Sequence, residues 1–335
     1  MKNVLISIII PCYNSEKWIV DTLKSLIYKE YEEYEIVFIN DGSNDKSLIK
    51  AKEFFLTTKL NYRIINQQNS GVSIARNEGI KNARGEYVYF LDSDDRVCNN
   101  FFDIVFENIK NKKSDMIFFD YDIVDGDKVV RCNNRNILNQ NGDETLKSIL
   151  DGTLNYHMCS FIIKRSVLSR NNILFTPNCK YGEDNEFIIK ALCNCKKVDI
   201  IKKTIFQYTL RNTSAVHKFS MDRLDSIYAA KRVENYVLKK INNPIIRELL
   251  KQYVGNKLVY NLHQYIKFSN KREPSYRFIK KELFKIIHEN REYLKYLNCH
   301  HNMIKRRIVY LITSNVNLYY IILLLKKNLL TSNSE

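Results

Sequence analysis

The stretch VLISIIIPCYN at residues 4–14 decides the fold. Its first seven residues are mostly apolar and β-branched, which is typical of a strand buried on both faces of a parallel sheet. Similar runs predict further strands, and segments with helical periodicity separate them: strands at 34–39, 62–65, 86–91 and 115–120, helices at 16–30, 45–57, 73–83 and 99–111. This alternation predicts an open, mostly parallel α/β sheet.

The pattern is weaker after residue 123. The later elements that it still predicts are a strand at 157–164, a helix at 183–193, a last strand at 205–210 and three helices at 221–240, 244–268 and 275–288. The last three carry apolar residues at three- and four-residue steps. The second half of the chain therefore changes from α/β to helical.

Composition and charge also divide the chain. Of 335 residues, 45% are apolar and 27% charged, which supports a folded core; nine Gly and four Pro exclude a collagen-like chain. Residues 1–218 carry 31 Lys and Arg against 28 Asp and Glu, whereas residues 219–335 carry 22 against 9. We therefore expect one domain at 1–218 and a basic helical region at 219–335.

The cysteines and the N-terminus indicate a cellular compartment. The eight cysteines include no C-x-x-C pair, so the spacing of a zinc ribbon is missing. Reduced thiols of a cytoplasmic protein are the expected state. The first apolar run is short for a secretory signal and reads better as a strand.

Acidic residues follow two of the predicted strands. Asp41 ends the strand at 34–39, and Asp92 and Asp94 end the strand at 86–91. Ligands bind at the carboxyl ends of parallel strands, and paired carboxylates suit Mg²⁺ or Mn²⁺. The alternative is a solvated turn that caps the next helix. The sequence contains neither a P-loop nor a G-x-G-x-x-G motif, so a Gly-rich phosphate loop is not predicted.

The order of the motifs resembles that of the family 2 glycosyltransferases, nucleotide-sugar-dependent enzymes with the GT-A fold. The resemblance covers about residues 4–218. The stretches that carry it are SIIIPCYN at 7–14, NDGS at 40–43, NSGVSIARN at 69–77, LDSDD at 91–95 and GED at 182–184. The Q-x-x-R-W motif of the processive synthases is missing, so one sugar per binding event is expected.

The resemblance implies roles for individual residues. Asp184 would be the catalytic base, with Glu183 beside it, and Asp94 would ligate the metal, Mn²⁺ or Mg²⁺. The donor would be held by Pro11, Tyr13, Asp41, Asn69, Arg76, Asp92, Ser93, Asp94 and Arg211. Within this set, Pro11 and Tyr13 would line the base pocket, and Arg211 would contact the diphosphate. The alternative for Glu183 and Asp184 is ordinary acidic residues at a helix start.

The basic region predicts an anionic partner. An anionic membrane surface fits it best, and the alternative is the solvated surface of a helical bundle. No nucleic-acid motif accompanies the charge, so nucleic acid is not expected. Residues 308–325 are flanked by basic residues but carry polar ones in the middle, which favours an interfacial or packing helix over a membrane span.

Together these features predict an inverting hexosyl- or N-acetylhexosaminyltransferase. It would move one sugar from a nucleotide donor, UDP-linked by expectation, to a growing bacterial surface glycan such as lipopolysaccharide, capsule or a lipid-linked chain. It would act in the cytoplasm at the inner face of the plasma membrane, with homo-oligomerisation left open. Two alternatives remain: a non-catalytic nucleotide-sugar or glycan-binding protein on the same fold, and a Mg²⁺-dependent phosphotransfer enzyme.

Overall fold

The chain divides into two compact units, Met1–Arg211 and Asn212–Glu335, which are described in turn. The computed structural model describes residues 4–28, 32–134, 137, 140–210, 220–268 and 274–296. Arg211 and residues 308–325 lie outside these ranges, so the predictions made for them are not addressed by the structure.

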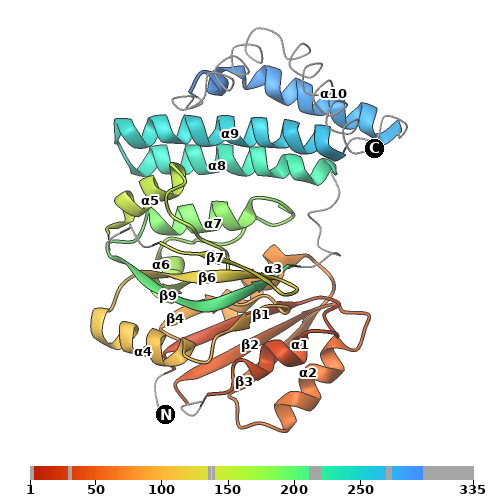
Figure 1. Ribbon diagram of the computed structural model, residues 1–335, viewed down its shortest axis with the longest axis vertical. Coiled ribbons are helices and arrows are strands. Elements are labelled where there is room, and N and C mark those ends of the chain that lie inside the picture. The colour runs from red at the N-terminus through yellow and green to blue at the C-terminus, as the bar shows by residue number, and fades with distance from the viewer. Residues whose placement is uncertain are drawn as a thin grey trace. The chain divides into compact units, whose positions relative to one another are not determined.

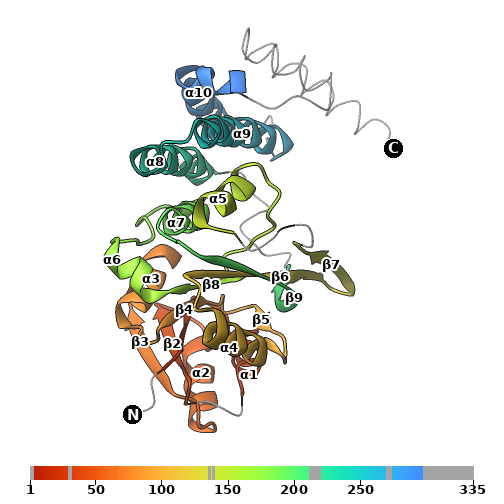
Figure 2. The same ribbon diagram turned by 90° about the vertical axis from the view of Figure 1, so that its left-hand side faces the viewer.

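The first unit is built on one sheet (Figures 1 and 2). Its strand order is β3-β2-β1-β4-β8-β6-β9-β5, with β7 paired to β6. The strands are β1 Ile6–Cys12, β2 Tyr34–Asp41, β3 Tyr62–Gln67, β4 Tyr87–Phe90, β5 Arg96–Val97, β6 Met116–Asp125, β7 Lys128–Cys132, β8 Phe161–Lys164 and β9 Val198–Thr209. The strands β3, β2, β1 and β4 are all parallel, and β8 joins them antiparallel. Their carboxyl ends therefore meet at one edge.

Helices cover both faces of this sheet. They are α1 Ile19–Lys24, α2 Ser47–Leu56, α3 Val72–Asn82, α4 Phe101–Lys112, α5 Gly142–Leu150, α6 Arg165–Arg170 and α7 Glu183–Leu192. All seven residues of β1 are buried, as expected for a strand covered on both sides. On one face its alternate isoleucines join the core formed with α1, α2 and α4. On the other face α3 approaches so closely that a Cβ at Gly79 would lie 2.3 Å from Ile9.

The α/β class is confirmed, and the differences from the predicted elements lie at their ends. The helix predicted at 16–30 spans only Ile19–Lys24, because a turn at 15–18 precedes it. The strand predicted from residue 157 begins at Phe161, since His157–Ser160 forms a turn closed by the bond from Ser160 N to His157 O. The last strand starts at Val198 rather than at 205.

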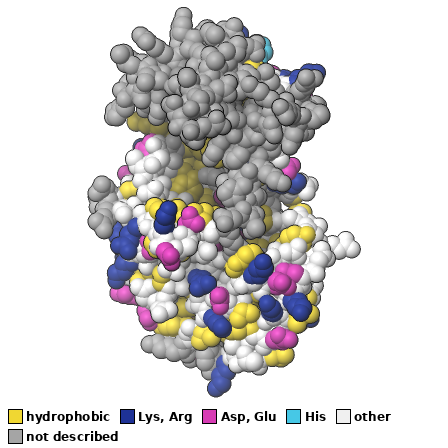
Figure 3. Space-filling model, turned by 45° about the vertical axis from the view of Figure 1, so that its right-hand side comes forward, with side chains coloured by type: hydrophobic (Ala, Val, Ile, Leu, Met, Phe, Trp, Pro, Cys, Tyr) yellow, Lys and Arg dark blue, Asp and Glu magenta, His cyan; other side chains and the backbone are white. Residues whose placement is uncertain are grey.

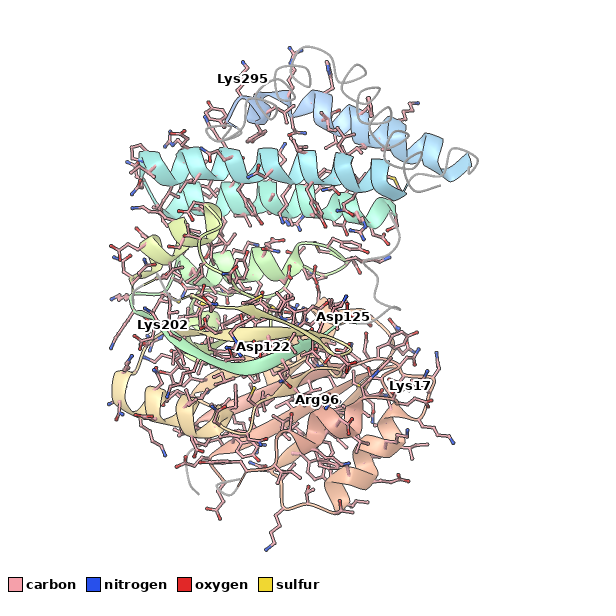
Figure 4. All side chains as sticks on the ribbon, viewed as in Figure 1. Lys17, Arg96, Asp122, Asp125, Lys202 and Lys295 are labelled. Carbon is pink, nitrogen blue, oxygen red and sulfur yellow. The ribbon has the colours of Figure 1, made fainter. Side chains whose placement is uncertain are left out.

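Four short elements of the first unit were not predicted at all. They are β5, β7, α5 and α6, which have two to nine residues each. Figure 4 labels Arg96 of β5 and Asp122 of β6. β5 exists only because Arg96 and Val97 pair with Gln207 and Phe206 of β9, more than a hundred residues later. On the face in Figure 3, the basic and acidic side chains of this unit are interspersed, in line with its near-balanced charge.

The second unit is helical. It contains η2 Met221–Leu224, α8 Asp225–Lys240, α9 Pro244–Phe268, α10 Pro274–Glu289 and η3 Arg291–Tyr296. The helices predicted at 221–240, 244–268 and 275–288 are confirmed within a few residues. Tyr293 donates a hydrogen bond of 2.6 Å to Glu234 of α8, and Lys251 of α9 donates one of 3.0 Å to Tyr296. Among the helices whose residues are described, none is both long and apolar enough to cross a membrane.

Candidate active site

A pocket of about 250 Å³ opens where β1 and β2 end and α3 begins. Its lining consists of Pro11, Cys12, Tyr13, Asp41, Asn69, Gly71, Val72 and Ala75. Four of these are predicted donor-binding residues, Pro11, Tyr13, Asp41 and Asn69. The Tyr13 side chain is 46% exposed, so its ring is available for stacking. An apolar pocket with a few polar groups is a typical site for a small ligand.

Asp41 shapes the wall of this pocket. Its Oδ1 accepts hydrogen bonds from Gln67 Nε2 (2.7 Å) and Ser70 N (2.8 Å), and its Oδ2 accepts one from Gly71 N (2.9 Å). Gly42 packs against the same loop, because a Cβ there would lie 2.6 Å from Asn69 N. The carboxylate at the end of β2 thus fixes the loop that leads into α3.

Arg76 lies one residue beyond the pocket on α3 and joins two acidic segments. Its Nη2 donates to Asp92 Oδ1 at 2.9 Å, and its Nη1 is 3.9 Å from Glu183 Oε1. The Arg76 side chain is only 5% exposed. Its Nε and Nη1 are buried and form no hydrogen bond to the described residues. These two groups are strong donors in a place where an anion would satisfy them.

The turn after β4 presents its four polar residues differently. Ser93 is buried: its hydroxyl lies 2.6 Å from Ser15 Oγ and its carbonyl accepts a hydrogen bond from Thr22. Asp95 is fully buried and accepts a hydrogen bond of 3.0 Å from Thr209 N. Asp92 and Asp94 remain partly exposed. The turn is therefore anchored through Ser93 and Asp95, whereas Asp92 and Asp94 reach the surface of the site.

Burial and charge act against each other at Asp92. Burial tends to raise the pKa of this carboxyl, but Arg76 outweighs it and holds the pKa below its ordinary value. Asp92 is therefore an anion at neutral pH. It can face a cation or accept a hydrogen bond from a hydroxyl group.

Glu183 and Asp184 open α7 behind Gly182, whose φ of +85° is in the left-handed region that favours glycine. Asp184 Oδ1 accepts hydrogen bonds from the backbone and side-chain nitrogens of Asn185 at 2.7 and 3.0 Å. The Asn185 side chain is in turn bonded by the Tyr156 hydroxyl. Asp184 is therefore held at the start of α7 by Asn185, which Tyr156 positions in turn.

Glu183 differs from its neighbour. Burial, together with the charge of Asp184, raises its pKa to about 7, although Arg76 opposes this. Its side chain is 12% exposed. Glu183 is thus a half-protonated partner of Arg76 near neutral pH.

This pKa predicts how the Glu183→Gln variant responds to pH. The folded chain binds the Glu183 proton more tightly than the unfolded chain, so wild-type stability falls as the pH rises from the ordinary pKa of Glu to about 7 and then levels off. Gln cannot ionise, so the variant gains relative to wild type by ~1–3 kcal/mol between pH 5 and pH 8. Urea unfolding of both proteins at the two pH values measures this difference.

The exposed Glu53 of α2 supplies the control, because Glu53→Gln should show no such pH-dependent gain. An equal difference between Glu183→Gln and wild type at both pH values would show that Glu183 ionises in its ordinary range.

His157 is a residue of the site that the sequence did not reveal. Its Nδ1 accepts a hydrogen bond of 3.2 Å from Cys159 N, and its ring stacks on Tyr208 with 4.5 Å between centroids. Burial lowers its pKa, while Asp92 and Asp184 act in the opposite direction. It was missed because its partners come from β9, from the turn after β4 and from the first turn of α7, and the local pattern at 123–178 is weak.

The residues present fit a divalent metal. Asp92, Asp94, Glu183 and Asp184 supply hard oxygen donors, and Arg76 pairs with two of them, Asp92 and Glu183. Hard oxygen donors suit Mg²⁺ and Mn²⁺. A second group, Asp95, His157 and Cys159, brings possible ligand atoms within 4.8 Å of one another. That set mixes O, N and S, and its Asp95 carboxyl already bonds Thr209.

The fold and the site define a glycosyltransferase of the GT-A type, and comparison with known proteins gives the family. Residues 7–171 match the model described as "Glycosyl transferase family 2". The chain belongs to this family. The predicted family, fold class and enzyme class are confirmed.

Two relatives come from Bacillus subtilis. "Uncharacterized glycosyltransferase EpsJ" is 29% identical over 68% of this chain and 68% of its own length. "Minor teichoic acid biosynthesis protein GgaB" is 32% identical over 61% of this chain but only 23% of its own length. Among solved structures, that of Staphylococcus aureus TarS residues 1–349 with UDP-GlcNAc has a TM-score of 0.72 at 20% identity. It covers 97% of this chain and 92% of that one, and it supports the fold alone.

Proposed function

We propose that this chain transfers one sugar, with inversion, from a UDP-sugar to a hydroxyl group of a bacterial surface glycan. The observation that carries the proposal is the junction of Arg76, Asp92 and Glu183 beside a pocket built from the ends of β1 and β2. The TarS structure with UDP-GlcNAc favours a uridine donor, and the named role of GgaB favours a teichoic acid-like or other cell-wall acceptor.

In this proposal the pocket takes the nucleotide and Arg76 takes its charge. The base stacks on Tyr13, beside Pro11 and Asn69. The diphosphate lies toward Arg76, whose buried Nε and Nη1 lack hydrogen-bond partners among the described residues. Asp92 accepts a hydrogen bond from a sugar or ribose hydroxyl. Ser93, being buried, supports the turn rather than touching the donor.

Asp184 is the base of the proposed reaction. An acceptor hydroxyl oxygen attacks the anomeric carbon as the bond to the diphosphate oxygen breaks. The hydroxyl proton goes to Asp184, and the nucleoside diphosphate leaves with the bonding electron pair. Attack from the side opposite the leaving group inverts the anomeric centre. A positioned base of this kind contributes ~10²–10⁴-fold to the rate.

Asp94 would hold the Mg²⁺ or Mn²⁺ ion. Such an ion, when bound, supplies positive charge to the leaving group. Arg76 supplies part of the same stabilisation from this chain.

The basic second unit fits a surface or polymer of negative charge. Its 22 Lys and Arg after residue 218 favour attachment to the anionic inner face of the plasma membrane, or contact with a phosphate-rich acceptor. In this proposal the enzyme is a peripheral cytoplasmic protein, and nucleic acid is not a partner. The domain division that accompanies it is a catalytic domain at 1–218 and a contact region at 219–335.

Nucleotide binding gives the direct test. We expect UDP, but not GDP or CDP, to raise the melting temperature in the presence of Mn²⁺. A ligand at ~100 times its Kd adds ~2.7 kcal/mol of stability. Asp94→Asn should lose the Mn²⁺-dependent part of the shift. The measurement is thermal unfolding with each nucleotide, with Mn²⁺ or with EDTA.

Activity assays with the same nucleotides and their sugars distinguish the two alternatives. A non-catalytic binding protein would show the shift but no turnover of a UDP-sugar with any acceptor. A phosphotransfer enzyme would release phosphate from the nucleotide without moving a sugar. A shift with GDP alone would overturn the uridine assignment.

A further inference from the structure

Asn77, the residue after Arg76 on α3, holds a segment that lies almost a hundred positions away. Its Nδ2 donates to Phe175 O at 2.9 Å, and Phe175 N donates to its Oδ1 at 2.8 Å. One side-chain amide thus satisfies both backbone groups of a single residue, as a neighbouring strand would. Four residues earlier on α3, Ser73 Oγ donates to Cys179 O at 3.3 Å. Ser73 and Asn77 lie on the same face of α3, and together they fix both ends of segment 175–179.

The same segment is bonded on its other side to α7. The Phe175 ring stacks on Phe187 with 4.0 Å between centroids and an interplanar angle of 2°. Thr176 Oγ1 donates to Glu186 Oε1 at 2.9 Å. Phe175, Phe187 and Glu186 are all at most 1% exposed. The buried rings of Phe175 and Phe187 therefore form a layer between α3 and α7, whereas Pro177 and Asn178 of the segment are exposed.

This layer also connects to the charged site. The Arg76 guanidinium lies over the Phe175 ring, 5.3 Å from its centroid. Arg76 then reaches Asp92 on one side and Glu183 on the other. Arg76 thus contacts the turn after β4 directly, and the next residue of α3, Asn77, contacts α7 through Phe175.

We infer that Asn77 is a positioning residue for Asp184. By fixing Phe175, it sets where the first turn of α7 stands relative to Arg76 and Asp92. This inference rests on the proposed function, because it takes Asp184 as the base. A misplacement of about 1 Å at a reacting group can cost ~10²-fold in rate. Asn77→Ala should therefore lower kcat by ~10–100-fold and leave the donor KM unchanged.

The test compares Asn77→Ala with Asn82→Ala. Asn82 is the last residue of the same helix, and its Nδ2 donates only within α3, to Glu78 O and Oε1 at 2.9 Å each. Asn82→Ala should keep the wild-type kcat. Asn77→Asp is a second variant of nearly the same shape, which keeps an acceptor for Phe175 N but loses the donor to Phe175 O. Asn77→Asp should show the same fall in kcat, and it takes the place of Asn77→Ala in the test if Asn77→Ala does not fold.

Two readouts decide the inference. The first is kcat and donor KM with UDP-sugar and acceptor. A kcat of Asn77→Ala equal to that of Asn82→Ala, or a rise in donor KM that accounts for the whole loss, overturns it. The second is hydrogen exchange of peptides covering residues 172–190, which needs no substrate. Faster exchange there in Asn77→Ala supports the link between α3 and α7, and unchanged exchange overturns it. Absence of transfer by the wild type would instead contradict the proposed function.

Discussion

Asp184→Asn should reduce kcat by ~10³-fold with the donor KM unchanged, because an amide of the same shape cannot accept the acceptor's proton. Asp184 stands in the first turn of α7, and its Oδ1 is held by Asn185 N and Nδ2. Both donors face a carboxylate oxygen that an Asn side chain can still provide. The fold and the nucleotide pocket should survive, so the loss should lie in the chemical step. Steady-state kinetics with varied donor and saturating acceptor measure it.

Asp143→Asn is the matched control. Asp143 also lies in the first turn of a helix, α5, but it is exposed. It should change neither kcat nor KM. If Asp184→Asn kept more than about a tenth of the wild-type kcat, a loss far below that of a positioned base, the base would have to be another group. Glu183, with its pKa of about 7, would be the next candidate.

Much of the fold could be predicted because the first half of the chain follows local rules. The run that forms β1 is buried along its whole length, and apolar segments of the same kind mark β2 and β4. The helices between them have clear apolar faces. Elements created by distant pairing were not predictable: β5 is two residues long and exists through β9. The local pattern of apolar residues cannot predict a strand that forms only by pairing with a distant one.

The residues of the candidate site also divide into those that local motifs predicted and those that depend on distant contacts. The motif order pointed to Pro11, Tyr13, Asp41 and Asn69, and the structure brings these four together in one pocket. It also brings Arg76 to Asp92 and Glu183. The motifs could not say that Ser93 faces inward to Ser15. They also could not reveal His157, whose ring contacts depend on Tyr208 about fifty residues later.

Arg76→Met should be the most destabilising change in the site, at ~3–5 kcal/mol. It leaves the carboxylates of Asp92 and Glu183, which are only 29% and 12% exposed, without their cation. The Arg76 side chain is 5% exposed and pairs with Asp92 at 2.9 Å. In wild type, Arg76 outweighs burial and lowers the pKa of Asp92. That stabilisation is present above the ordinary pKa of Asp and is lost as the pH falls. Asp92 is ionised at both pH 5 and pH 8, but Glu183, whose pKa is about 7, is mostly neutral at pH 5 and ionised at pH 8. The cost of Arg76→Met should therefore be larger at pH 8 than at pH 5, as measured by urea unfolding at each pH.

Arg96→Met is the control for the loss of an arginine. Arg96 (Figure 4) pairs with Asp21 at 3.1 Å, but both side chains are about half exposed, so the expected cost is at most ~1 kcal/mol. Arg76→Lys should fall between the two, since it keeps the charge but loses the planar fork that faces Asp92 and Glu183. If Arg76→Met cost no more than Arg96→Met, the buried carboxylates would have to be neutral without Arg76. In that case the charge of Arg76 would not be what holds the turn after β4 and the first turn of α7 together.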